Sequence, residues 1–185
     1  MRYPILSLLL AALTLSGCAG QGHQASYIAQ QADAPYTLAS GDRLRVIVYG
    51  QDSLSNSYNV DGTGRISMPL IGFVEAQGMT VAQVERTIES RLRNGFLRDP
   101  KVAAEVISYR PFFILGEVTT AGQYPYISGM TVQNAIAVAG GFTPRAAKST
   151  VDLTRVVRGQ SLTASVPVTE KIRPGDTVTI RERFF

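Results

Sequence analysis

An apolar run that ends in a cysteine decides which part of this 185-residue chain forms the folded body. Arg2 is the only charged residue before Ile5–Leu15, which is almost wholly apolar and is followed by Ser16, Gly17 and Cys18. The run has the length of a signal-peptide core and is too short for a permanent membrane-spanning helix. Small residues before a cysteine form a lipobox, in which the thiol accepts a diacylglycerol. We therefore expect residues 1–17 to be a signal peptide and Cys18 to carry lipid.

Lipidation of Cys18 would place the protein at the outer membrane, facing the periplasm. Ala19, rather than an aspartate, follows the cysteine, which favours the outer membrane by general lipoprotein sorting rules. Several acyl chains anchor stably, whereas a single chain is marginal. The alternative is a plain secretory signal with an incidental cysteine. Because Cys18 is the only cysteine, no intrachain disulfide can form. No later apolar run approaches the roughly 20 residues of a spanning helix.

Composition excludes several classes of function. The formal net charge of +4 is mild and spread along the chain without a lysine-rich tract, so we expect no nucleic-acid partner. A mild basic excess could suit an acidic saccharide, although inert surfaces often carry one. His23 is the only histidine, and it precedes the expected folded body. A Ser-His-Asp triad and a multi-histidine metal site are therefore excluded there, and we expect no enzyme activity, cofactor or metal.

After the cysteine, the sequence predicts an α+β fold of two small modules, each with one main helix packed on a sheet. Residues 18–35 are polar, small and aperiodic apart from the lipid site, which is typical of a flexible tether. Alternation of polar and apolar residues predicts a strand at 43–48. A capping box formed by Thr80 and Gln83 predicts a helix over 81–94. Its apolar stripe consists of Val81, Val84, Ile88 and Leu92.

The second half, from residue 109, contains predicted strands at 112–115, 124–127, 151–157, 166–168 and 178–180, and a shorter helix from Thr131. Two short motifs occur in both halves. Gly78-Met79-Thr80-Val81 recurs as Gly129-Met130-Thr131-Val132, and Leu38-x-x-Gly41-Asp42 recurs as Ile172-x-x-Gly175-Asp176. They are either common cap and turn solutions or traces of a relation between the halves. Because Asp42 and Asp176 each follow a glycine at a turn, we expect their carboxylates to accept hydrogen bonds from nearby backbone N–H groups.

Some side chains are candidate contacts with a glycan or a neighbouring subunit. A cationic cluster lies in and after the first helix, and a solvated helix face is its simpler explanation; its members are Arg86, Arg91, Arg93, Arg98 and Lys101. Tyr124 and Tyr126 alternate with a proline in a predicted hairpin, where aromatic rings either stack on sugars or support cross-strand packing. Phe184 and Phe185 are either tucked against the sheet or presented to a partner or lipid.

The mature chain resembles the bacterial outer-membrane polysaccharide export lipoproteins. Tyr36-x-Leu38-x-x-Gly41-Asp42-x-Leu44-x-Val46 is similar to the start of their export domain, and Val60-Asp61-Gly62-x-Gly64-x-Ile66-x-Met68-Pro69-Leu70-Ile71-Gly72 to its central signature. Phe113-x-Leu115-Gly116-Glu117-Val118 and Gly122-x-Tyr124 resemble the soluble-ligand-binding β-grasp (SLBB) module that follows. The resemblance implies an export domain over 36–108 and an SLBB domain over 109–185. It is closest to a short form, since no C-terminal pore helix follows the last predicted strand.

The resemblance implies a non-enzymatic component of a capsular or extracellular polysaccharide export machine. Its expected partners are the polysaccharide, further copies of itself in a ring or collar, an inner-membrane copolymerase and a separate outer-membrane β-barrel. One alternative is a monomeric lipoprotein that captures saccharide without conducting it. A periplasmic hydrolase or lyase is a third, which would need a pair of carboxylates facing a cleft, and the sequence nominates no such pair.

Overall fold

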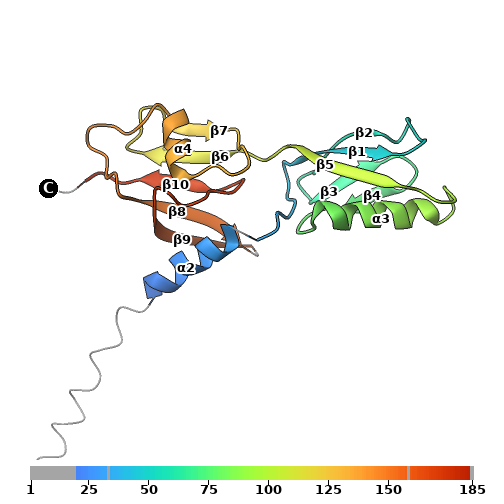
Figure 1. The fold of residues 1–185 in the computed structure, drawn as a ribbon, viewed down its shortest axis with the longest axis horizontal. Helices are drawn as coiled ribbons and strands as arrows, with labels where there is room; N and C mark the ends of the chain where they lie inside the picture. The colour runs from blue at the N-terminus through green and yellow to red at the C-terminus, as the bar shows by residue number, and fades with distance from the viewer. Residues whose placement is uncertain (1–19, 33, 158, 184–185) are drawn as a thin grey trace, which may run out of the picture.

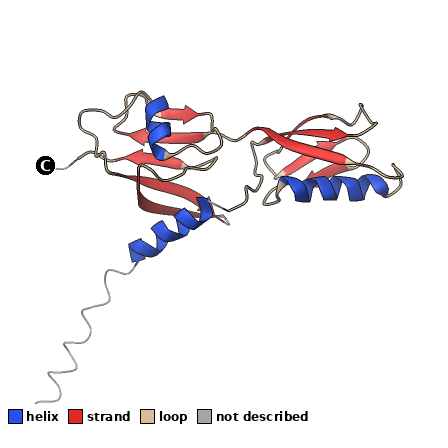
Figure 2. Cartoon of the chain, in the orientation of Figure 1, coloured by secondary structure: helices blue, strands red, loops and turns tan. Residues whose placement is uncertain are grey.

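The computed structural model describes residues 20–32, 34–157 and 159–183. It contains the two α+β units that the sequence predicts, and they lie end to end along the long axis of the molecule (Figure 1). Each unit packs a helix on strands (Figure 2). Their buried apolar side chains form two separate clusters, one per unit. Within the described ranges, no helix combines the length and apolar character needed to cross a membrane.

The first unit is built on a three-stranded antiparallel sheet with the order β2-β1-β5. Strand β1 buries alternate residues, Leu44, Val46 and Val48, as the sequence pattern predicts. A separate β3–β4 hairpin and helix α3 complete the core. The bounds are Arg43–Val48 for β1, Asn56–Asn59 for β2, Arg65–Met68 for β3, Gly72–Glu75 for β4, Val81–Arg93 for α3 and Val102–Ser108 for β5.

Helix α3 confirms the predicted stripe and cap. Val84, Ile88 and Leu92 are fully buried against the sheet and the hairpin. The side chain of Thr80 accepts a hydrogen bond from the Gln83 backbone, and the Gln83 side chain accepts one from the Thr80 backbone. This reciprocal arrangement satisfies backbone donors that a helix start otherwise leaves free.

The second unit is a five-stranded sheet with the order β7-β6-β10-β8-β9, in which β10 and β6 are parallel and the other pairs antiparallel. Two strands differ from the prediction. The partner of β6 is β7 rather than 124–127, and β9 extends well beyond 166–168 because it pairs along the whole of β8 despite its polar sequence. The bounds are Phe112–Gly116 for β6, Gly122–Tyr124 for β7, Val132–Val138 for α4, Thr150–Val157 for β8, Gln160–Pro167 for β9 and Thr177–Ile180 for β10.

The prediction of a flexible tether over 18–35 is wrong for most of that segment. Residues Gly20–Ala32 form a helix, α2, that lies against β9. Ile28 is fully buried in the core of the second unit, and its carbonyl accepts a hydrogen bond from the buried Arg155 guanidinium at 2.8 Å. Ile28, the partly buried Ala25 and one hydrogen bond from a distant strand hold the helix, and these contacts leave no marked periodic pattern in the sequence.

Replacing Ile28 by serine is expected to detach α2, since it removes the helix's fully buried apolar anchor. Loss of a buried isoleucine side chain costs about 2–5 kcal/mol, which exceeds what a short isolated helix can supply. Limited proteolysis should then cleave within residues 20–32 much faster than in the parent protein. Ser26→Ala changes an exposed position of the same helix and should leave the cleavage rate unaltered. If the parent, Ile28→Ser and Ser26→Ala proteins were all cleaved at the same rate, the packing of α2 through Ile28 would be contradicted.

The repeated motifs make the same contact in both units. Thr80 and Thr131 each form a capping box at a helix start. The Leu38 amide donates to the Met79 carbonyl at 2.8 Å, and the matching Ile172 amide donates to the Met130 carbonyl at 3.0 Å. The chain order is reversed, because the Gly-Asp motif precedes the helix in the first unit and follows it in the second. Each motif therefore contributes to a shared strand-to-helix junction.

Candidate functional site

The two Gly-Asp turns lie at the junction between the units. In the first turn the buried Asp42 carboxylate accepts hydrogen bonds from the Ala39 backbone N–H at 2.8 Å and the Tyr36 hydroxyl at 2.5 Å. It also accepts one from the backbone N–H of Arg110, at 2.9 Å, and lies 3.5 Å from that residue's guanidinium. Burial and the hydrogen bond to Asp42 raise the pKa of Tyr36 well above its ordinary value, so this hydroxyl remains a donor at neutral pH. The carboxylate thus fixes the link between the units.

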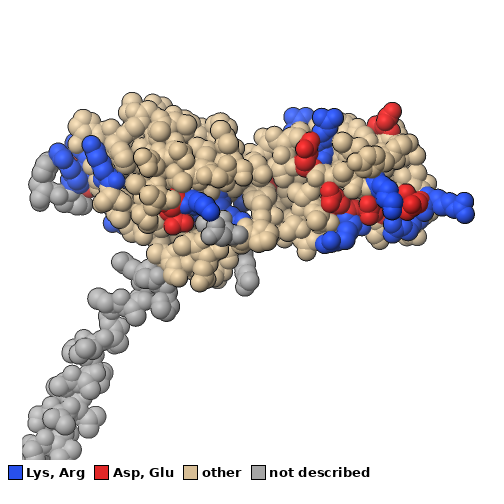
Figure 3. All heavy atoms as spheres, viewed as in Figure 1, with Lys and Arg blue, Asp and Glu red and all other residues tan. Residues whose placement is uncertain are grey.

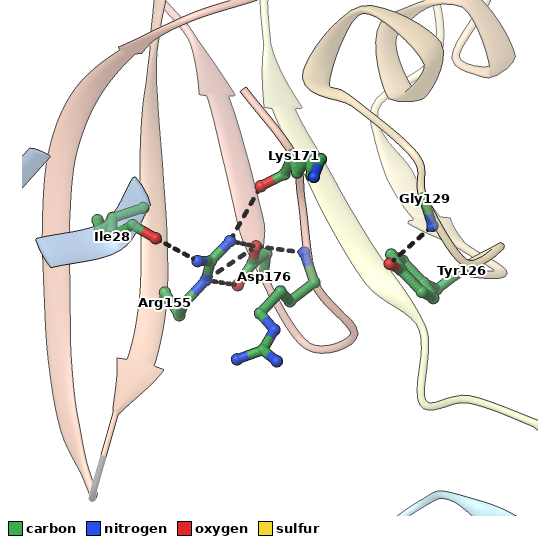
Figure 4. A network of polar contacts seen from close by, with 7 residues as sticks. Ile28, Tyr126, Gly129, Arg155, Lys171 and Asp176 are labelled. Carbon is green, nitrogen blue, oxygen red and sulfur yellow. Dashed lines mark hydrogen bonds and ion pairs between the residues drawn. The ribbon is translucent and has the colours of Figure 1, made fainter. Parts of the chain in front are cut away.

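The second turn is built in the same way. Asp176 accepts the Arg173 backbone N–H at 2.7 Å, as Asp42 accepts that of Ala39. These two contacts confirm the backbone role expected of both aspartates. Asp176 is also paired with Arg155, whose Nε and Nη2 donate to the two carboxylate oxygens at 3.0 and 2.7 Å (Figure 4). Burial raises the pKa of Asp176, and the Arg155 guanidinium opposes that effect.

Arg155 is the centre of a buried polar network. Its remaining donors reach the Ile28 carbonyl of α2 and the Lys171 carbonyl, at 2.8 and 3.1 Å. The arginine is only 4% exposed. A guanidinium has five donors in a fixed fork, so one side chain can join three segments at once. Strand β8, helix α2 and the turn before β10 are held together in this way.

Arg110 lies against both Gly-Asp turns. A Cβ on Gly41 would lie 3.4 Å from the Arg110 Cβ, and one on Gly175 would lie 2.6 Å from its Nε. Both glycines have positive φ, 93° and 84°, a region that other residues rarely adopt. Glycine is required here for its backbone conformation and, at Gly175, for the close approach of the guanidinium. Arg110, which lies in the link between β5 and β6, is therefore held in a fixed position against both turns.

Three tyrosines meet at this junction. The Tyr36 and Tyr109 rings are edge to face with centroids 5.0 Å apart, and Tyr109 and Tyr126 repeat that arrangement at 5.4 Å. The Tyr126 hydroxyl accepts a hydrogen bond from the Gly129 amide at 3.3 Å. The rings line a groove of about 290 Å³, whose other walls include Ser128, Lys171 and Arg173.

Arg173 gives the groove a cationic wall. It is half-buried, and its Nη2 donates to the carbonyls of Ala34 and Pro35 at 2.6 and 3.4 Å. Desolvation, followed by repulsion from Arg155, lowers the pKa of Arg173. Its positive charge is therefore incompletely solvated. Among the described residues that line the groove there are two cations, Lys171 and Arg173, and no carboxylate.

The expected cationic cluster lies on α3 and just after it. Arg86 and Arg91 line a shallow hollow on the exposed helix face, whereas Arg93 does not. Arg91 also donates a hydrogen bond to the Phe73 carbonyl, and Lys101 pairs with Asp99 at 3.4 Å. Figure 3 shows cations and carboxylates mixed over this end of the molecule. The glycan or subunit role of these arginines stays a prediction.

Tyr124 and Tyr126 have different surroundings although they are two residues apart. Tyr124 stacks on Phe112 at 6.0 Å and donates to the Thr120 carbonyl at 2.7 Å, so it supports the packing of β6 and β7. Tyr126 instead contacts Tyr109 at the junction.

Cys18, Phe184 and Phe185 lie outside the described residues. Within the described ranges, no group of three or more His, Cys, Asp or Glu side chains could hold a metal ion.

No local pattern in the sequence reveals the groove. Tyr36 and Tyr109 are far apart in the chain, and Arg173 lies further still. Each residue is unremarkable within its local pattern, so only the docking of the two units reveals the site. One signal was available, since Tyr36 and Tyr109 are the first residues of the two predicted modules, 36–108 and 109–185.

Comparison with known proteins agrees with the two-unit organisation. The polysaccharide biosynthesis/export protein family matches residues 30–107, and the SLBB domain matches residues 111–164. The chain is 34% identical over 145 residues to the exopolysaccharide production protein ExoF of Rhizobium meliloti, covering 72% of this chain and 32% of ExoF.

A second relative is the polysialic acid transport protein KpsD of Escherichia coli. It is 26% identical over 133 residues, covering 71% of this chain and 24% of KpsD. The chain therefore spans about a third of ExoF and a quarter of KpsD. With an export domain followed by an SLBB domain, and with these relatives, the chain belongs to the family of polysaccharide biosynthesis/export proteins.

Proposed function

We propose that this protein is a non-enzymatic, periplasm-facing component of a capsular or extracellular polysaccharide export machine, held at the outer membrane by lipid on Cys18. The observation that carries the proposal is the export domain match over residues 30–107, followed directly by an SLBB domain. The names of the relatives, exopolysaccharide production and polysialic acid transport proteins, support polymer export as the process.

The machine is proposed to contain several copies of this chain in a ring or collar. The tip of the β3–β4 hairpin supports this, because Leu70 and Phe73 are 56% and 55% exposed. Leu70 has φ of 69°, and the Ile71 amide donates to the Pro69 carbonyl at 2.9 Å across it. A strained backbone that presents apolar side chains to solvent is typical of a contact surface. An inner-membrane copolymerase and a separate outer-membrane channel protein are the proposed further partners.

A monomeric glycan-binding lipoprotein is the second candidate, and the tyrosine-lined groove favours it. Oligomer mass separates the two candidates. Native mass spectrometry of the lipidated protein extracted in mild detergent should give a closed multiple of the protomer mass if the ring proposal holds. A protomer alone, with bound saccharide, would favour the second candidate.

The export role is tested by deleting the gene and measuring where polysaccharide accumulates. We expect surface polymer to be lost and restored by the full-length chain supplied in trans. Unchanged surface polymer in the deletion strain would contradict the proposal.

Cys18→Ala is expected to abolish attachment to the outer membrane while leaving both folded units intact, because the described buried cores are built from Ile28 onward. Labelled palmitate should no longer be incorporated, and surface polysaccharide should fall. Ala19→Ser is the matched control, since it retains the cysteine and adds no aspartate. Palmitate incorporation and outer-membrane fractionation by the Cys18→Ala protein would show that the lipid assignment is wrong.

A further inference from the structure

The groove between the units combines features that no single module has. Tyr36 precedes the first strand of the first unit, and Tyr109 lies in the link between β5 and β6. Tyr126, Lys171 and Arg173 belong to the second unit. We propose that this groove binds one anionic sugar residue, such as a uronic or sialic acid unit, of the polymer. This inference rests on the proposed export function and adds to it a contact site and a class of substrate.

The aromatic wall is fixed before any ligand arrives. The two edge-to-face contacts and the hydroxyl bonds of Tyr36 and Tyr126 restrain three rings. Rigid rings lose little conformational entropy on binding, which raises affinity. Tyrosine offers an apolar face and a polar edge, and a sugar ring offers C–H groups on its faces and hydroxyls at its edge. The two surfaces are chemically complementary.

The size of the groove suits a single sugar unit. Its volume of about 290 Å³ lies at the lower end of the usual range for small-molecule pockets, about 300–1,000 Å³. One unit of a longer polymer can enter such a groove while the neighbouring units remain in solvent. A contact of this kind is suited to a polysaccharide that moves past the protein, because each sugar residue can bind and dissociate separately.

The positive charge of the groove favours binding of an anionic sugar residue. Its lining contains Lys171 and Arg173 and no carboxylate among the described residues. The nearby Asp42 and Asp176 side chains are buried and already hydrogen-bonded to Tyr36, Arg110 and Arg155. The Arg173 guanidinium uses Nη2 for the carbonyls of Ala34 and Pro35. A planar guanidinium matches a carboxylate geometrically and retains further donors for it.

Arg110 connects the groove with the relative position of the units. It donates to the Tyr36 hydroxyl at 2.9 Å, and its guanidinium carbon lies 5.9 Å from the centre of that ring. The same side chain approaches both Gly-Asp turns. The groove therefore exists only while the units are docked, and an occupied groove should favour the docked arrangement.

The test is isothermal titration calorimetry of the full-length chain with trimers of galacturonic acid and of sialic acid. The matched neutral probes are the same trimers with their carboxyl groups methyl-esterified. We expect at least one acidic trimer to bind, with at least a tenfold weaker affinity for its ester. We expect Tyr109→Leu and Arg173→Gln each to weaken binding of the acid at least tenfold. Raising the salt concentration should also weaken it, because the charge pair is partly exposed.

Two control variants remove the same kinds of side chain elsewhere. Tyr49→Leu replaces a tyrosine that is 66% exposed on the first unit, and Lys148→Gln removes an exposed cation of the second unit. Both should bind as the parent does. Amide NMR shifts of Ser128 and Gly129 should move on titration, whereas that of Ser90 in the α3 hollow should not. If Tyr109→Leu fails to fold, Arg173→Gln and the NMR shifts still decide the outcome.

The site is overturned if neither acidic trimer binds, if the esters bind equally well, or if shifts move at Ser90 and not at Ser128 and Gly129. If the chain nevertheless restores surface polymer to the deletion strain, the export role stands and only the binding site in this groove is rejected. Conversely, binding at the groove in a protein whose deletion leaves surface polymer unchanged would retain the site and reject export.

Discussion

Replacing Asp176 by alanine is expected to lower the free energy of unfolding of the second unit by about 3–5 kcal/mol. The change leaves Arg155 as a buried cation without its counter-charge, and it removes the acceptor for the Arg173 backbone N–H. Attraction between buried charges offsets their loss of hydration only when both partners are present. Chemical denaturation followed by circular dichroism measures the effect, and detachment of α2 should accompany it because Arg155 also holds the Ile28 carbonyl.

Arg181→Gln is the matched control for that experiment. Arg181, directly after β10, forms a bidentate pair with Asp152 on β8, the strand that also carries Arg155, but its side chain is 57% exposed. Exposed pairs contribute about 0–1 kcal/mol, so this variant should unfold almost as the parent does. Equal losses in the two variants would show that burial does not distinguish the two ion pairs.

Ile88→Asp is expected to unfold the first unit. Ile88 is fully buried in the middle of α3, facing the sheet. The substitution removes about 2–5 kcal/mol of apolar packing and adds the cost of a buried polar group. This is a large part of the roughly 5–15 kcal/mol by which a domain is stable. Amide NMR spectra should lose the dispersed signals of the first unit, while those of the second unit persist because its core is separate.

Ser90→Asp is the control for Ile88→Asp. It introduces the same side chain two residues later on the exposed face of α3, and a surface substitution of this kind usually changes stability by less than about 0.5 kcal/mol. A folded Ile88→Asp protein with an unchanged melting temperature would mean that α3 does not bury this face.

Local sequence patterns predicted the elements that depend on interactions between residues close together in the chain. The stripe on α3, its capping box and the alternation along β1 depend on residues within one or two turns of each other, so periodicity reveals them. The two Gly-Asp turns are also local, because each carboxylate accepts the amide three residues earlier. The same four-residue motifs could not show that Leu38 meets Met79 and Ile172 meets Met130, since those contacts join distant segments in opposite chain orders.

The errors have a common cause as well. Helix α2 has no marked apolar face, and it is held by Ile28 and by an arginine that lies on β8. Strand β9 is largely polar and is defined by its pairing with β8. In both cases the stabilising partner is distant in the chain, so the segment's own composition carries little information about its structure.

The sequence by itself determined the α+β class, the two modules, the family, and the backbone role of both aspartates. Tertiary structure alone decided that Tyr36, Tyr109 and Tyr126 form one wall, and that Arg110 lies against both turns. The physical reason is the range of the interactions. Hydrogen bonds and apolar periodicity within one element leave a pattern in neighbouring residues, whereas a groove between docked units depends on side chains whose proximity only the folded chain creates.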